Sequence, residues 1–134
     1  MKLVRYGRTG KEKPGMLDAD GKIRDLSGRI NDITPDQLSP KAIARLEKIN
    51  PARLPLVKGR PRLGPPLAGV GNFICIRLNY TDHAEETGHP IPTEPVIFSK
   101  HTSAISGPND DVILPKGSTK TDWEVEIGFV IGTE

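Results

Sequence analysis

The chain has 134 residues, which is enough for one domain at most. Only 35% of these residues are hydrophobic and 4% are aromatic, a thin supply for a self-sufficient core. Nineteen Lys and Arg face 17 Asp and Glu, with the two signs interspersed, which argues against a nucleic-acid-binding or anionic-membrane-binding surface. We therefore expect neither nucleic acid nor a membrane as partner.

The single cysteine, Cys75, excludes an internal disulfide and favours a reducing compartment. Residues 1–7 are not followed by the apolar stretch of a signal peptide, and no apolar run is long enough to span a bilayer. These features predict a soluble, cytoplasmic protein. We expect Cys75 itself to be a small buried hydrophobe, since it lies within an apolar run.

The N-terminal quarter favours two or three antiparallel strands. Residues 3–6 have a short strand pattern, and residues 16–26 bracket Asp20-Gly21, a dipeptide suited to a tight hairpin turn. Ser39-Pro40 then predicts the start of a short amphipathic helix, which ends before Pro51.

A stretch rich in proline and glycine, residues 51–70, predicts a connection between two structural units. We place the boundary near Leu67, giving a small N-terminal α/β region over 1–66 and a second region over 67–134. The second region is mostly β; its expected elements are a strand at 72–77, a helix at 79–87, and strands at 94–100, 111–114 and 123–131. The overall class is a β-rich α+β fold, and because the chain stops just after its best strand signal we expect a truncated architecture.

Three acidic side chains share one face of the last predicted strand. Alternation sends Asp122, Glu124 and Glu126 to one face and the apolar residues between them to the other. Carboxylates gathered in this way suit a hard divalent cation such as Mg²⁺, Mn²⁺ or Ca²⁺. The alternative is a solvent-facing strand whose acids resist aggregation, and the spacing alone does not decide between them.

A histidine and a glutamate are spaced for contact on one helical turn. His83 and Glu86 stand three residues apart, and a carboxylate beside an imidazole can raise its basicity and so favour activation of water. The alternative is an ordinary surface helix. Lys100 ends an apolar strand, where it could balance an acidic site or simply protect the strand end. His89 and His101 have no partner at ligand spacing, and we expect both on loops or the surface.

The order of these motifs resembles a known family. The stretch NFICIRLNYTDHAEETGHPIPTEPVIFSK, continued by DWEVEIGFVIG, is similar to the start of the catalytic domain of the fumarylacetoacetate hydrolase family. The opening MKLVRYG and KPGMLDADGKIRDLS are similar to the small N-terminal region of bacterial ureidoglycolate lyases and 2,4-diketo-3-deoxy-sugar-acid hydrolases. The resemblance implies a mixed β-sandwich roll, of which this chain would contain the first part.

The resemblance also implies a site. Glu124 and Glu126 match two of the family's metal ligands, for Mg²⁺ or a similar cation; His83 and Glu86 match its water-activating dyad; and Lys100 matches a lysine that faces the substrate. The implied substrate is a small keto or hydroxy acid, and the implied full-length assembly is a homodimer. The implied reactions are hydrolysis of a carbon–carbon bond in a 2,4-diketo acid, or elimination of urea from ureidoglycolate to leave glyoxylate.

Two departures from the family pattern favour a different reading. Arg77 stands where the family usually has glycine, and a side chain there could crowd the pocket or disturb the turn into the following helix. The third metal ligand of the family has no counterpart in this chain. The alternative is therefore a catalytically inactive remnant, or a non-enzymatic binding or assembly module.

Overall fold

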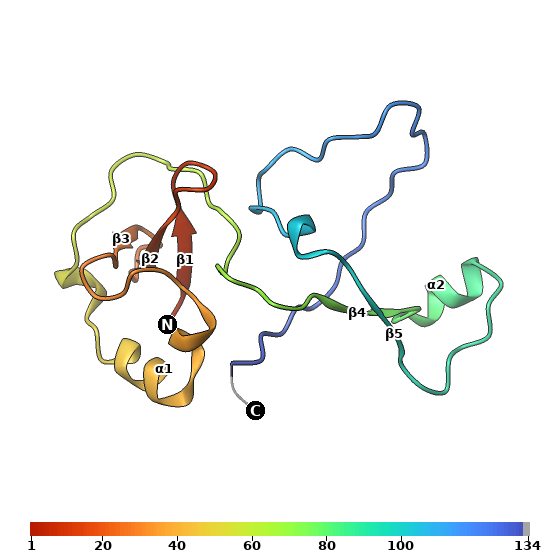
Figure 1. Ribbon diagram of the computed structural model, residues 1–134, viewed down its shortest axis with the longest axis horizontal. Helices are drawn as coiled ribbons and strands as arrows, with labels where there is room; N and C mark the ends of the chain where they lie inside the picture. The colour runs from red at the N-terminus through yellow and green to blue at the C-terminus, as the bar shows by residue number, and fades with distance from the viewer. Residues whose placement is uncertain (133–134) are drawn as a thin grey trace. The chain divides into compact units, whose positions relative to one another are not determined.

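The computed structural model describes residues 1–132, drawn as a ribbon in Figure 1. The chain divides into two compact units, Met1–Gly69 with the segment from Ser106 onward, and Val70–Ile105. We call them the first and second units and describe each by itself. The sequence-based division at Leu67 stays a prediction.

The first unit is built on a three-stranded antiparallel sheet. Its strands are β1 (Leu3–Tyr6), β2 (Lys13–Leu17) and β3 (Ile23–Asp25), in the order β1-β2-β3. The turn between β2 and β3 contains Gly21 at a φ of +74°, a conformation that glycine adopts without a steric cost. The hairpin predicted around this position is therefore confirmed.

The predicted helix is also present, as α1 (Pro40–Glu47). The Ser39 hydroxyl accepts a hydrogen bond from the Ala42 amide at 3.3 Å, and Pro40 fits the first turn, where its missing N–H costs nothing. The helix buries Ala42 and Leu46. Two short 3₁₀ turns flank it, η1 (Pro35–Leu38) and η2 (Pro51–Arg53).

The core of the first unit is small and aliphatic. It is supplied by β2, by the loop after β3, by α1 and by the segment after η2; its buried members are Met16, Leu26, Ile30, Ile33, Leu46 and Leu54. Four partly buried residues pack against it, namely Leu3, Leu38, Ile49 and Leu67. The first unit therefore has a small hydrophobic core, as the low content of hydrophobic residues predicts.

The second unit contains an antiparallel ribbon of two strands, β4 (Ile74–Arg77) and β5 (Val96–Ser99). It also contains the helix α2 (Thr81–Glu86) and the 3₁₀ turn η3 (Thr102–Ala104). These elements confirm the strand, helix and strand predicted over 72–100. Both strands are largely exposed, and a two-stranded ribbon is only marginally stable by itself. Cys75 is partly buried, which is less than the burial we expected.

Two predicted strands are absent. Residues 111–114 and 123–131 form no strand in the structure, although both have strong β patterns. A strand exists only where its backbone joins a ladder with a neighbour, and no ladder includes these residues in the part of the chain that is described. The β-rich α+β class holds, with fewer strands than expected. None of the described helices is long and apolar enough to cross a membrane.

Truncating a core leucine tests this description of the first unit. Leu26 is fully buried, so Leu26→Ala should leave a cavity and lower the free energy of unfolding by about 2–5 kcal/mol. The matched control is Leu56→Ala, at a half-exposed side chain, which should lower the free energy of unfolding by no more than about 0.5 kcal/mol. Urea denaturation followed by circular dichroism measures both; equal losses would contradict the placement of the core.

Candidate functional site

The predicted dyad lies on α2. His83 and Glu86 are three residues apart on this six-residue helix, so they share one side of a helical turn, and both are exposed. The end of the helix is held by Thr87, whose hydroxyl donates to the His83 carbonyl at 2.7 Å. The structure thus places the two side chains on the same short element, within the second unit.

The turn that leads into α2 explains how the chain tolerates Arg77. Arg77 is the last residue of β4 and is paired with Val96, in extended backbone. The left-handed residue of this turn is Leu78, at a φ of +53°. A side chain at position 77 therefore introduces no backbone strain, and any cost of replacing glycine there would have to come from crowding.

Lys100 follows β5 directly. Its amide donates to the Phe73 carbonyl at 3.0 Å, which continues the β4–β5 pairing by one residue. Its ammonium lies 5.9 Å from the centre of the Phe98 ring, within the range of a cation–π contact. The neighbouring His101 is exposed and accepts a hydrogen bond from the Ser103 amide, and His89 is exposed as well, as predicted for both.

The two predicted metal ligands lie in the first unit. Glu124 and Glu126 are exposed and belong to an irregular segment. Their carboxylate oxygens are of the type that Mg²⁺ and Mn²⁺ prefer, but residues 1–132 contain no cluster of three or more His, Cys, Asp or Glu side chains arranged to hold a metal ion. The described residues therefore offer a pair of donors and not a complete coordination set.

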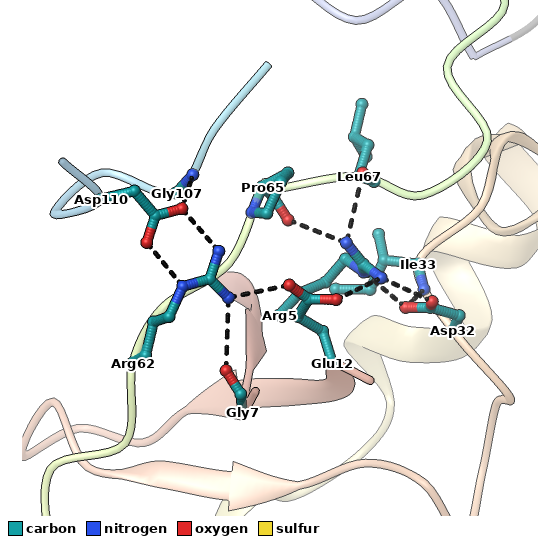
Figure 2. Close-up of polar contacts among 10 residues, drawn as sticks. All are labelled: Arg5, Gly7, Glu12, Asp32, Ile33, Arg62, Pro65, Leu67, Gly107 and Asp110. Atoms are coloured by element: carbon teal, nitrogen blue, oxygen red, sulfur yellow. Dashed lines mark hydrogen bonds and ion pairs between the residues drawn. The ribbon is translucent and has the colours of Figure 1, made fainter. Parts of the chain in front are cut away.

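A network of ion pairs, which the sequence patterns did not indicate, organises the first unit (Figure 2). Arg5 is buried on β1 and binds Asp32 through two hydrogen bonds, of 2.8 Å from Nε and 2.9 Å from Nη2. Its Nη2 also lies 3.6 Å from Oε2 of Glu12. Two-point pairing of this kind fixes geometry as well as charge.

Arg62 extends the network into the segment after β5. It donates to Glu12 at 2.8 Å and to both carboxylate oxygens of Asp110 at 2.5 Å each. Asp110 in turn accepts from the Gly107 amide at 2.7 Å. Glycine is needed at 107, because a Cβ there would lie 2.2 Å from the Leu63 carbonyl oxygen. The network thereby ties the proline-rich connection to the turn at 107–110.

These contacts hold the acids in their charged form. The Arg62 guanidinium lowers the pKa of Glu12, with a further contribution from Arg5, and it lowers the pKa of Asp110 as well. For Asp32, burial alone would raise the pKa, but the hydrogen bond from Arg5 helps to bring it below its ordinary value. Every charge in the network has an opposite charge beside it, which favours the ionised form of each acid.

Comparisons with known proteins show what the second half of the chain is similar to. Residues 72–134 match the profile described as the C-terminal region of fumarylacetoacetate (FAA) hydrolase. The match includes all five residues singled out by the sequence, His83, Glu86, Lys100, Glu124 and Glu126.

Curated relatives extend the likeness to the whole chain. A protein of Burkholderia ambifaria named "putative hydrolase" is 62% identical over 133 residues, 99% of this chain and 47% of the relative. One from Burkholderia multivorans is 61% identical over 132 residues, again 47% of the relative. The chain thus spans about half the length of the curated relatives it matches. Their names specify a hydrolase and no substrate.

Solved structures support the fold class. A "putative HpcE protein" from Mycobacterium smegmatis has a TM-score of 0.61 at 29% identity, over 88% of this chain and 42% of that protein. Fumarylacetoacetate hydrolase from Exiguobacterium antarcticum has a TM-score of 0.55 at 25% identity, over 79% of this chain and 37% of that enzyme. The predicted similarity to this fold family is confirmed, whereas the lyase subtype, the homodimer and the cytoplasmic location stay predictions.

Removing the charge of Glu12 tests the network. Its side chain is 5% exposed, so Glu12→Gln should lower the free energy of unfolding near neutral pH by about 1–3 kcal/mol. Because the pKa of Glu12 is lowered on folding, its charge stabilises the protein above the unfolded pKa of about 4.3. This stabilisation is lost as the pH falls through the lower folded pKa, so wild type and variant should converge in acid.

The matched control is Asp20→Asn, which removes a carboxylate that is 72% exposed and 3.6 Å from the Lys22 ammonium. It should change the free energy of unfolding by less than about 1 kcal/mol at any pH. Urea denaturation of both variants over a pH series gives the comparison. A loss in Glu12→Gln that does not depend on pH would show that the charge of Glu12 is not the stabilising feature.

Proposed function

We propose that this chain supplies the first part of a divalent-metal-dependent hydrolase or lyase of the fumarylacetoacetate hydrolase family, acting on a small keto or hydroxy acid. One observation carries the proposal. The family match over residues 72–134 contains, in order, an imidazole and a carboxylate on one helix, a lysine after a strand, and a pair of glutamates. Each residue type occurs elsewhere on many surfaces, and it is the ordered combination that supports an enzyme.

Glu124 and Glu126 would contribute two oxygen ligands to the cation, with the remaining ligands supplied from outside the described residues. When bound, a divalent cation neutralises and orients an acidic substrate. Both residues are exposed to solvent. We further propose that the complete protein is a cytoplasmic homodimer.

The roles of the other three residues follow from their chemistry. Glu86 orients the His83 imidazole, which takes a proton from water, and the resulting hydroxide adds to a carbonyl of a diketo acid. The carbon–carbon bond next to that carbonyl then breaks, leaving a carboxylic acid and an enolate. The Lys100 ammonium stabilises the developing negative charge, and the proton held by His83 is returned to the enolate carbon.

With ureidoglycolate as substrate, the same groups would support elimination of urea to leave glyoxylate. A second candidate function, a non-enzymatic assembly module, is favoured by one observation: the apolar side chains over 123–131 are exposed and no strand forms there. The two candidates differ in one expectation. The enzyme needs His83 and Glu124 for turnover, whereas the assembly module has no turnover to lose.

The test uses a chimera in which this chain replaces the matching residues of the Burkholderia ambifaria relative. We expect the chimera to consume a 2,4-diketo acid or ureidoglycolate in a reaction that depends on Mg²⁺ or Mn²⁺. The loss of absorbance of the diketo acid, or the release of urea, measures this turnover. Glu124→Gln should abolish metal-dependent turnover by removing a ligand charge. His83→Ala should lower kcat by about 10²–10⁴ while leaving the affinity for the metal unchanged.

Two exposed residues of the same types serve as matched controls. Glu94→Gln and His89→Ala lie outside the proposed site and should leave turnover within about twofold of the parent chimera. Near-normal activity of Glu124→Gln or His83→Ala would refute the corresponding role. A folded chimera inactive on both substrate classes would favour the assembly module.

A further inference from the structure

The ribbon of β4 and β5 has two faces of different character. In an antiparallel pair, directly opposed residues share a face, and every second residue along a strand returns to that face. One face is uncharged, and its residues are Ile74, Ile76, Ile97 and Ser99. The other face pairs Cys75 with Phe98 and Arg77 with Val96. Within these two strands, the only charged side chain thus lies on the second face.

Lys100 belongs to the face that carries Arg77. Its amide donates to the Phe73 carbonyl, which continues the pairing of the ribbon, and it lies two residues beyond Phe98. Its ammonium lies 5.9 Å from the centre of the Phe98 ring, so the side chain leans back along β5, toward the end of the ribbon that carries Arg77. The pair of Phe98 and Cys75 is about 7 Å from the pair that contains Arg77, because a strand rises about 3.4 Å per residue. Two cationic side chains therefore share one face of the ribbon.

The guanidinium of Arg77 is available to a ligand. The side chain is exposed, and its guanidinium forms no hydrogen bond or ion pair within residues 1–132. In the first unit, by contrast, Arg5, Arg24 and Arg62 each bind a carboxylate. A guanidinium presents several donors in a planar fork that matches a carboxylate, whereas the ammonium of Lys100 is a point charge. Arg77 therefore adds to this face a group suited to bind a carboxylate at two points.

We propose that Arg77 is a specificity-determining residue that binds a second carboxylate of the substrate, so that this chain selects keto acids with a carboxylate at each end. This inference rests on the proposed function, in which Lys100 acts on the substrate. The keto acid end lies beside Lys100, and the distal carboxylate accepts hydrogen bonds from the Arg77 guanidinium. Glycine, which the family usually has at this position, offers no such group. Arg77 thus changes the choice of substrate and not the chemistry at His83.

A matched pair of ligands tests the role of Arg77 in the chimera with the Burkholderia ambifaria relative. 2-Oxopentanedioate and 2-oxopentanoate have the same chain length and the same keto acid end, and only the dioate has a second carboxylate. With Mn²⁺ present, we expect calorimetric titration to show that the dioate binds at least about 10-fold more tightly. Arg77→Gln and Arg77→Gly should each reduce the ratio of the two Kd values to within about twofold, by weakening the binding of the dioate alone.

The control variants separate recognition from net charge and from folding. Arg60→Gln removes the same charge from an exposed arginine of the first unit, and the ratio of the two Kd values should stay within about twofold of the parent. Arg77→Lys keeps a cation at the same place and should preserve a preference for the dioate. Because the Arg77 side chain is exposed, none of these changes should alter the circular dichroism of the chimera.

Equal affinity of the parent for the two acids, or binding of neither, would overturn the proposal. A preference for the dioate that survives in Arg77→Gln would overturn it as well. If Arg77 instead pairs with an acid elsewhere in the chimera, Arg77→Gln lowers the melting temperature and leaves the ratio of Kd values unchanged, which also contradicts the proposal. These measurements do not require turnover. Failure of the proposed catalysis would appear as a parent chimera without turnover whose preference for the dioate is intact, so the two failures are distinguishable.

Discussion

The guanidinium of Arg62 is the group on which the arrangement of the first unit most depends. It binds Glu12 beside β2 and Asp110 in the later turn, and Glu12 in turn approaches Arg5. The proline-rich connection that carries Arg62 has few apolar residues with which to pack, so charge-assisted hydrogen bonds take the place of a larger core. Acids and bases alternate along the network, so each acid lies beside at least one guanidinium.

These ion pairs stabilise a chain that has few apolar residues and buries them mainly in its N-terminal part. The core cluster draws on the first 54 residues, with Leu67 packed against it, whereas the large apolar side chains near the C-terminal end are exposed. The same contrast holds for the candidate site. The dyad is set on a formed helix, while the two glutamates lie on a segment with no regular structure. In the described residues the last element of regular structure is η3, so both contrasts follow from the lack of helix and strand after residue 104.

Local signals in the sequence predicted the local structure well. Asp20-Gly21 predicted the hairpin and Ser39-Pro40 predicted the helix start, because each dipeptide acts through its own backbone. The prediction of a strand over 123–131 was wrong for this chain, because a strand also needs a neighbouring strand, which the pattern does not specify. The pairing of Arg62 with Asp110 could not be predicted, because 48 residues separate them and neither belongs to a periodic element.

For the site, the sequence identified residue types and their order, and the roles of these residues stay a prediction; all of them lie within the range that matches the family. The sequence could not predict the arrangement of the ligands in space, because the ligands of one cation converge only when the strands that carry them are paired. The structure adds that Arg77 is accommodated in extended backbone and that Leu78 takes the left-handed position. Neither could be inferred from the substitution of glycine alone.

The most direct test of this account is a calorimetric titration of Mn²⁺ into the isolated chain and into the chimera with the longer relative. We predict that the isolated chain, with Glu124 and Glu126 as a pair of ligands, binds Mn²⁺ no more tightly than with a Kd of about 1 mM, and that the chimera binds it at least about 100-fold more tightly. Equal affinities would contradict it. They would mean that the 134 residues complete the metal site by themselves.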